Sequence, residues 1–249
     1  MRTGHIREFF DLADAADKAW DYSIYWMDGS APAGKLGRGW FERGRLATDA
    51  AAGQGLVAPK APLFTVPFRF PINAVNGVSA RVFCRAFYHR PRASVARIPY
   101  GGFLFPLDAA ALWNRFYGPQ RMVKFQMVLP RATAPLAVEE VWQAVHADGQ
   151  VPCIATMKLM GEMEPAGMLS FPRAGVSLTI EDMWYQGVRT EKLLRSLEEI
   201  VLGAGGALYP AKDSTMTPKV YAASYPDAAA FEVFKDPAFM SDFWQRVGE

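Results

Sequence analysis

Cysteine and histidine are both scarce in this chain, which contains two cysteines and three histidines among its 249 residues. Cys84 and Cys153 each have apolar neighbours, which predicts two buried free thiols in a reducing compartment and therefore a cytoplasmic protein. His5, His89 and His146 are far apart and form no HxH or HxxxH pattern, so we expect no metal site.

The chain also has no large excess of charge of one sign and no long apolar segment. The 27 Lys and Arg residues nearly balance the 25 Asp and Glu residues, which gives a formal net charge of +2. Without a strongly basic surface or a nucleic-acid-binding motif, we expect no binding to DNA or RNA. No stretch reaches the roughly 18 consecutive apolar residues of a membrane-spanning helix. The start of the chain also lacks the apolar segment of a signal peptide.

The sequence motifs of several enzyme classes are missing. There is no G-x-S-x-G nucleophile elbow and no Walker A sequence, so the corresponding hydrolases and NTPases are not supported. Glycines cluster at 34–39 and 203–206, but a dinucleotide-binding loop leads from a strand into a helix, and neither cluster does so. We interpret both clusters as turns or helix caps.

Hydrophobic periodicity, in contrast, is clear between residues 122 and 209. The elements it predicts are strand Met122–Pro130, helix Leu136–Ala147, strands Cys153–Met160 and Gly175–Trp184, helix Thr190–Leu202 with Thr190 as N-cap, and strand Ala207–Tyr209. This succession is the ferredoxin-like order. It predicts an α+β fold, in which helices cover one side of an antiparallel sheet.

The flanking segments extend this prediction. A helix is expected at 5–20, strands at 21–28 and 40–46, and helices at Asn76–Arg90 and Leu107–Tyr117. Residues 214–249 are expected to be helical and to pack on the outside. The length of the chain fits one large domain or two small ones.

A series of short stretches then occurs in a distinctive order: Ser23–Asp28, Lys35–Arg38, Arg43–Ala47, Phe105–Asp108, Trp113–Gly118, Phe125–Pro130, Met157–Gly161, Leu169–Pro172, Gly205–Ser214 and Tyr225-Pro226. In this order and spacing they resemble the C-terminal part of FAD-linked oxidases of the vanillyl-alcohol-oxidase type. The resemblance implies that residues 1–249 form the substrate-binding (cap) domain of an FAD-dependent oxidoreductase acting on CH–OH donors. It also implies that the N-terminal FAD-binding domain of the family is absent from this chain and lies in a separate or missing chain.

The resemblance implies roles for individual residues. Lys212 matches a catalytic lysine beside the flavin, where its charge would stabilise negative charge on the ring. Tyr209 and Lys212 are expected to contact FAD, and Trp26, Gln126 and Lys158 to contact substrate. The alternatives from the pattern alone are a solvated lysine beside a helix cap at 212, solvent-facing strand residues at 126 and 158, and a core tryptophan at 26.

Three further substrate-binding candidates are departures from a sugar-oxidising member of this family. Lys124 replaces a glutamine, and Ser177 and Thr179 replace an asparagine and a cysteine. A pocket this polar favours a sugar, polyol, sugar lactone or lipid-linked sugar over an apolar aromatic alcohol. The alternative function is a non-catalytic module that binds a ligand or partner without flavin.

The expected helix over 76–92 suggests a contact with a membrane surface. On a helical wheel the basic residues fall on one face and apolar residues on the other, namely Arg81, Arg85, His89 and Arg92 against Val82, Phe83, Ala86 and Phe87. A basic amphipathic helix can lie on anionic lipid. Because the family includes an enzyme of a lipid-linked sugar, we predict peripheral contact with the inner membrane face. The alternative is a solvated helix face over the core.

Overall fold

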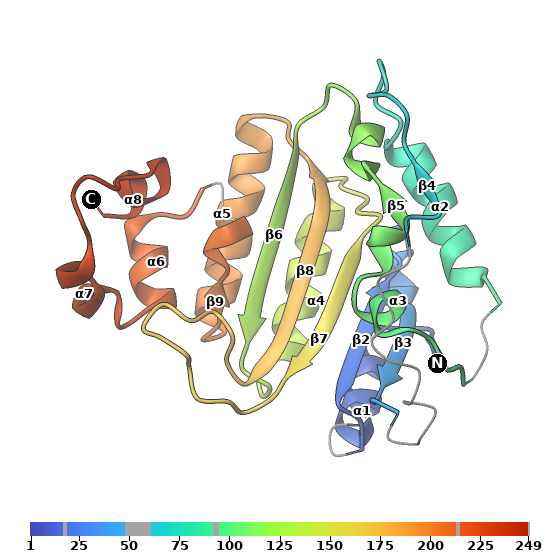
Figure 1. Ribbon diagram of the computed structural model, residues 1–249, viewed down its shortest axis with the longest axis horizontal. Coiled ribbons are helices and arrows are strands. Elements are labelled where there is room, and N and C mark those ends of the chain that lie inside the picture. The colour runs from blue at the N-terminus through green and yellow to red at the C-terminus, as the bar shows by residue number, and fades with distance from the viewer. Residues whose placement is uncertain (17–18, 48–60, 92–94, 213–214, 249) are drawn as a thin grey trace.

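Alternation of apolar and polar side chains along the chain produces one seven-stranded antiparallel sheet (Figure 1). The computed structural model describes residues 1–249 except 17–18, 48–60, 92–94, 213–214 and 249. The strands lie in the order β1-β3-β2-β7-β8-β6-β9. Their bounds are β1 Arg2–Thr3, β2 Tyr22–Met27, β3 Gly39–Gly44, β6 Met122–Leu129, β7 Ala155–Met160, β8 Gly175–Trp184 and β9 Ala207–Leu208. The predicted α+β fold with an antiparallel sheet is confirmed.

Residues 122–209 contain the predicted succession of strand, helix, two strands, helix and strand. In order these are β6, α4 (Ala134–Ala147), β7, β8, α5 (Val188–Gly203) and β9, and the four strands lie as β7-β8-β6-β9. β6 and β7 therefore run in the same direction, with β8 antiparallel between them. This half of the sheet carries most of the predicted site residues.

The predicted start of α5 was wrong. Thr190 is not the N-cap, because the helix already begins at Val188 after Gly187. The hydroxyl of Thr190 accepts from the backbone N–H of Gln186 at 2.8 Å and donates to the carbonyl of Trp184 at 3.0 Å. The side chain thus closes the turn that leads into the helix instead of capping it.

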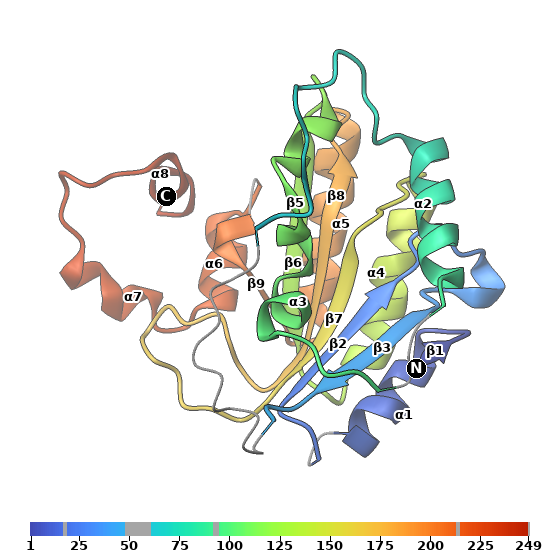
Figure 2. The same cartoon turned by 45° about the vertical axis from the view of Figure 1, so that its right-hand side comes forward.

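One face of the sheet is covered by α1 (Arg7–Ala16), α4 and α5 (Figures 1 and 2). Every second residue of β6, including Phe125 and Met127, points into this layer and joins a single apolar core with the fully buried Trp142 of α4. Each such large side chain contributes on the order of 1.5–3 kcal/mol when it leaves water. The intervening residues of each strand are therefore free to face the other side.

A helix also lies on the other side of the sheet. α2 (Gly77–His89) follows the N-cap Asn76, whose side chain accepts from the N–H groups at 78 and 79. Its Phe87 ring lies 6.0 Å from the ring of Trp26, and the indole N–H of Trp40 donates to the carbonyl of Tyr88 at 2.9 Å. These contacts place α2 against β2 and β3, on the face that α1 leaves open.

The two faces predicted for α2 are arranged differently from the helical wheel. The helix buries Ala80 and Cys84, whereas Val82 and Phe83 are 65% and 49% exposed. Arg81 and Arg85 are exposed beside them, and Arg92 lies outside the described residues. The exposed surface of α2 is therefore both basic and apolar.

The helix predicted over Leu107–Tyr117 was wrong. Its residues form the 3-10 turns η3 (Pro106–Ala109) and η4 (Trp113–Tyr117), separated by the short strand β5 (Ala110–Ala111). β5 pairs in parallel with β4 (Phe64–Thr65), and the left-handed φ of 56° at Leu112 interrupts any helix. The short helix α3 (Tyr100–Leu104) precedes this region, and η1 (Ala33–Lys35) follows β2.

The C-terminal region is helical, as predicted. Its elements are η5 Pro210–Lys212, α6 Pro218–Ser224, α7 Ala228–Phe231, η6 Glu232–Phe234 and α8 Asp242–Val247. They lie beyond α5, at the end of the sheet formed by β9 (Figure 1). None of the helices in the described ranges is long and apolar enough to cross a bilayer.

Candidate functional site

The register of the sheet places predicted substrate residues in one row on the face opposite α4 and α5. Gln126 of β6 pairs with Thr179 of β8, which pairs with Thr156 of β7, which pairs with Trp26 of β2. The neighbours of Gln126 along β6 are buried in the core, so its own side chain points away from it. One row thus runs across four strands, with neighbouring strands about 4.8 Å apart.

A second row lies beside the first. Ser177 of β8 is flanked by Val128 of β6 and by Lys158 of β7. The amide nitrogen of Gln126 donates to the hydroxyl of Ser177 at 3.4 Å, which links the two rows. We call the outward polar residues of these three strands the polar patch: Lys124, Gln126, Thr156, Lys158, Ser177, Thr179 and Glu181.

An ion pair closes one end of the polar patch. The ammonium group of Lys124 contacts the carboxylate of Glu181, and it also lies 5.7 Å from the centre of the Trp113 ring. Side-chain exposures of 37% for the lysine and 19% for the glutamate leave the pair in contact with solvent. Sequence reasoning missed Glu181, although its spacing of two from Thr179 and four from Ser177 was a signal that it shares their face.

Tyr209 and Lys212 reach the same place from the edge of the sheet. β9 pairs with β6, and the backbone N–H of Tyr209 donates to the carbonyl of Gln126 at 2.9 Å. The backbone N–H of Lys212 then donates to the carbonyl of Tyr209 at 3.1 Å, which forms the turn η5. The ring of Tyr209 lies 4.6 Å from that of Phe171.

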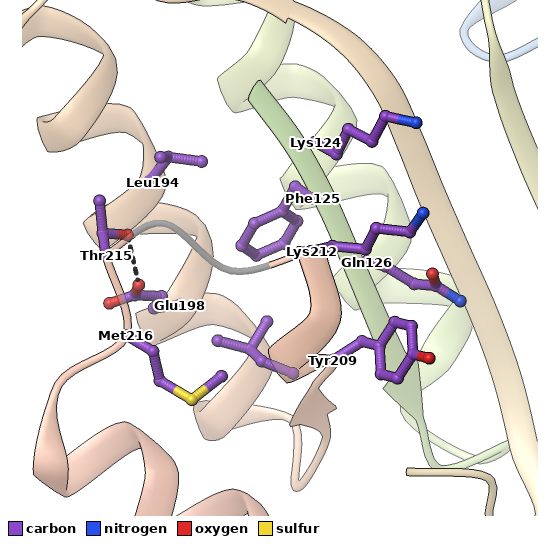
Figure 3. Close-up of a pocket in the computed structure, with 10 residues that line it drawn as sticks. Lys124, Phe125, Gln126, Leu194, Glu198, Tyr209, Lys212, Thr215 and Met216 are labelled. Atoms are coloured by element: carbon purple, nitrogen blue, oxygen red, sulfur yellow. Dashed lines mark hydrogen bonds between the residues drawn. The ribbon is translucent and has the colours of Figure 1, made fainter. Parts of the chain in front are cut away.

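Figure 3 shows how these side chains are directed. Lys124, Gln126, Tyr209 and Lys212 point to the same side of β6, and Phe125 points to the other. The ammonium group of Lys212 has no ion-pair or hydrogen-bond partner in the described part of the chain. Asp213 and Ser214, which end the motif, lie outside the described residues.

Two predicted residues lie further away. Trp26 is three strands from Gln126, about 14 Å at the usual strand spacing, and it lies under Phe87 of α2. Lys158 is exposed and lines a separate hollow with Trp20 and Phe103. The structure therefore brings Lys124, Gln126, Ser177, Thr179, Tyr209 and Lys212 together, sets Lys158 beside them, and leaves Trp26 apart.

A buried carboxylate holds β7 and β8 at the edge of this face. Asp182 is 2% exposed and accepts from the backbone N–H groups of Cys153 and Ile154 at 2.9 and 3.0 Å. β7 consequently begins at Ala155 and not at the predicted Cys153. Burial raises the pKa of Asp182 to about 6, although these two hydrogen bonds oppose the shift.

The two thiols do not form a reactive centre. Both are free; Cys84 is buried, as predicted, and Cys153 is half-buried. A hydrogen bond with the Cys84 side chain, together with burial, raises the pKa of the Cys153 thiol far above its ordinary value. A thiol held protonated is a poor nucleophile. Among the described residues, no group of three or more His, Cys, Asp or Glu side chains could hold a metal ion.

Comparison with known proteins supports the resemblance found in the motifs. No protein-family model matches the chain. The chain is 30% identical to decaprenylphosphoryl-beta-D-ribose oxidase of Mycolicibacterium smegmatis, over an alignment of 262 residues that covers 98% of this chain. The alignment covers 55% of that oxidase, so the chain spans about half the length of the relative it matches. Similarity to an FAD-linked oxidase, along nearly the whole chain, is thus confirmed.

Proposed function

We propose that this chain is the substrate-binding domain of an FAD-dependent oxidoreductase that oxidises a CH–OH group of a sugar, polyol, sugar lactone or lipid-linked sugar. One observation carries the proposal. Gln126, Thr179 and the segment with Tyr209 and Lys212 are far apart in sequence, yet they come together on the face of the sheet opposite the core helices. Similarity to an oxidase along 98% of the chain supports the same proposed function.

The residues of this face suit a flavin and a hydroxylated substrate. When bound, FAD would take up the two electrons and the hydrogen that leave the carbinol carbon. Lys212, which no acidic side chain of the described chain neutralises, would stabilise negative charge on the ring. Tyr209, placed against Phe171, would form a rigid wall of the pocket.

The polar patch would select the substrate. Gln126, Ser177 and Thr179 offer amide and hydroxyl groups in adjacent positions, and these groups can donate to and accept from several sugar hydroxyls. Ser177 and Thr179 are already buried, so an apolar alcohol packed against them would leave their hydrogen-bonding groups unsatisfied, at a cost of about 1–3 kcal/mol for each unpaired group. A polyhydroxylated substrate is therefore favoured.

A second, FAD-binding domain is part of the proposal. The unmatched part of the oxidase is large enough for one. Large apolar side chains are exposed along two neighbouring segments of this chain: Leu63, Phe64, Phe68, Ile72, Ile98, Tyr100, Leu104, Phe105, Leu107 and Leu112. Extended exposed apolar surface of this kind is typical of a contact with another domain or chain. Free thiols at 84 and 153 are consistent with a cytoplasmic location.

The test is to tag the chain in its native host, purify it with whatever associates with it, and record the visible spectrum. We expect a flavin absorbance band that bleaches under anaerobic conditions when a suitable sugar, polyol or lactone is added. A flavin band that no such compound bleaches would contradict the substrate class. A colourless preparation would contradict the enzymatic proposal and leave the alternative of a binding module without flavin.

A further inference from the structure

We propose that Glu181 determines which substrates the polar patch accepts, by pairing with Lys124 so that this end of the patch binds neutral hydroxyl groups and disfavours anions. The inference rests on the proposed function, because it specifies the substrate class of the same site. Neither the motifs nor the family resemblance pointed to Glu181.

The placement of Glu181 follows from the strand register. Ser177, Thr179 and Glu181 follow one another at intervals of two along β8, so they share the outward face. Thr179 pairs directly with Gln126, and the pairing of β6 with β8 then shifts between Val123 and Phe125. The shift brings Lys124 opposite the end of this row, where its ammonium group meets the Glu181 carboxylate.

The ion pair is connected to the pocket through Lys124, which Glu181 contacts from the neighbouring strand β8. Lys124 lines the same pocket as Gln126, Tyr209 and Lys212, and its side chain points to the same side of β6 as theirs (Figure 3). Both partners are partly exposed, so a ligand on the patch can reach them. Glu181 is also the one carboxylate in the polar patch as defined above.

The chemistry of the pair matches a hydroxyl group. A carboxylate only accepts hydrogen bonds and an ammonium group only donates them, whereas a hydroxyl does both. A substrate hydroxyl can therefore donate to Glu181 and accept from Lys124 at once. A carboxylate or phosphate brought to Lys124 would also meet Glu181, and two like charges 4 Å apart repel by about 1 kcal/mol even in water.

The other two cations near the patch lie on other elements, although Lys212 lines the same pocket as Lys124. Lys158 is two strands from β6, about 10 Å at the usual spacing, and lines a different hollow. Lys212 stands at the edge of the sheet on η5, where the proposal places the flavin. The charge of the side chain at position 181 therefore determines which substrate groups bind at the Lys124 end of the polar patch.

The inference can be tested on the chain itself by titrating two probes into the 15N-labelled protein and following the amide signals by NMR. D-Glucitol and D-gluconate have the same carbon skeleton and differ at one end, a hydroxymethyl or a carboxylate. We expect glucitol to shift signals of residues 124–126 and 177–181 in the wild type. In Glu181→Gln, we expect the affinity for gluconate relative to glucitol to rise about fivefold, the factor that about 1 kcal/mol gives.

Two further variants sharpen the test. Lys124→Gln leaves Glu181 without its cation, so the relative affinity for gluconate should fall by about the same factor. If Glu181→Gln does not fold, Lys124→Gln still tests the inference by itself. Glu140→Gln removes the same charge from an exposed position on α4, on the opposite side of the sheet, and should leave the ratio unchanged.

The outcomes separate this inference from the proposed function. Probe shifts on the patch, with a glucitol-to-gluconate ratio that neither variant changes, would overturn the role of Glu181 and leave the substrate face intact. Shifts that avoid the patch in the wild type, or no shifts with either probe, would overturn both the role of Glu181 and the proposed substrate face.

Discussion

The backbone N–H of Tyr209 donates a hydrogen bond of 2.9 Å to the carbonyl oxygen of Gln126. Through this single bond, a residue expected beside the flavin is fixed to a residue expected to bind substrate. The bond extends the ladder between β9 and β6 by one step, and the turn η5 then carries Lys212 over the end of the strand. The edge of the sheet thus sets the relative position of Tyr209, Lys212 and Gln126.

Replacement of Lys212 by alanine should reduce turnover of the flavin-loaded protein about a hundredfold and hardly affect stability. Its ammonium group makes no contact that holds the described chain together, whereas loss of one charge stabiliser at a developing anion costs roughly 3 kcal/mol of barrier. Steady-state kinetics and thermal melting measure the two effects. The control is Lys219→Ala, an exposed lysine on α6. Turnover of Lys212→Ala within about threefold of wild type, under about 1 kcal/mol, would remove Lys212 from the site.

The isolated chain should bind FAD weakly, with a dissociation constant above about 1 µM, or less than roughly 8 kcal/mol of binding free energy. A flavin pyrophosphate is usually held by a glycine-rich loop that opens a helix, and no helix in the described ranges starts at a G-x-G-x-x-G loop. Calorimetric titration of FAD into the chain measures the affinity. Submicromolar binding would show that a second domain is not needed to hold the cofactor.

The ionisation of Asp182 should make the protein less stable as the pH rises from about 4 to about 6. Burial raises the pKa of its carboxyl from 3.8 to about 6, so the folded state binds more protons than the unfolded state across this window. The stability that this proton binding contributes is complete below the unfolded pKa and is lost as pH rises through the folded pKa. The difference of about two pKa units corresponds to on the order of 3 kcal/mol.

Urea unfolding of the wild type and of Asp182→Asn, each at pH 4 and at pH 7, isolates this contribution. The asparagine cannot titrate, so any change that the substitution itself causes in the free energy of unfolding is the same at both pH values. We expect the wild type to lose stability relative to the variant on going from pH 4 to pH 7. A relative gain for the wild type, or no change, would mean that the carboxyl is ionised in the folded protein throughout.

Much of the central sheet could be predicted from the sequence because its patterns are local. Hydrophobic periodicity and the proline at 130 marked β6 as a strand, and the same periodicity predicted the strand that carries Ser177 and Thr179. Family motifs then identified Tyr209 and Lys212. These predictions depended on neighbours in the sequence, which fix the face of a strand on which each side chain lies.

The remaining features depend on contacts between distant segments. Glu181 was missed because its partner is set by the register shift between β6 and β8, which the hydrophobic pattern of one strand does not reveal. The helix predicted over 107–117 was wrong because β5 pairs with β4, more than forty residues earlier in the chain. The buried side of α2 was set by contact with β2 and not by its helical wheel, so Val82 and Phe83 are exposed.

We propose, finally, that α2 makes peripheral contact with an anionic membrane surface. Val78, Val82 and Phe83 are 71%, 65% and 49% exposed and lie close to exposed Arg81 and Arg85. Apolar side chains can enter the interface of the bilayer while the arginines attract anionic headgroups, at about 1 kcal/mol for each. The full chain should therefore sediment with phosphatidylserine-containing vesicles at low salt but not with neutral phosphatidylcholine vesicles, and added salt should weaken the binding.

Two double variants distinguish this contact from general electrostatic adsorption. Removal of both α2 arginines, in Arg81→Gln with Arg85→Gln, should reduce sedimentation with the anionic vesicles by about 2 kcal/mol, or roughly thirtyfold in affinity. Lys192→Gln with Lys219→Gln removes the same charge from exposed positions on α5 and α6 and should have little effect. Equal losses in the two double variants would indicate adsorption without a specific surface. If the wild type does not sediment with anionic vesicles at low salt, α2 is a solvated helix, and a free sugar or lactone becomes the better candidate substrate.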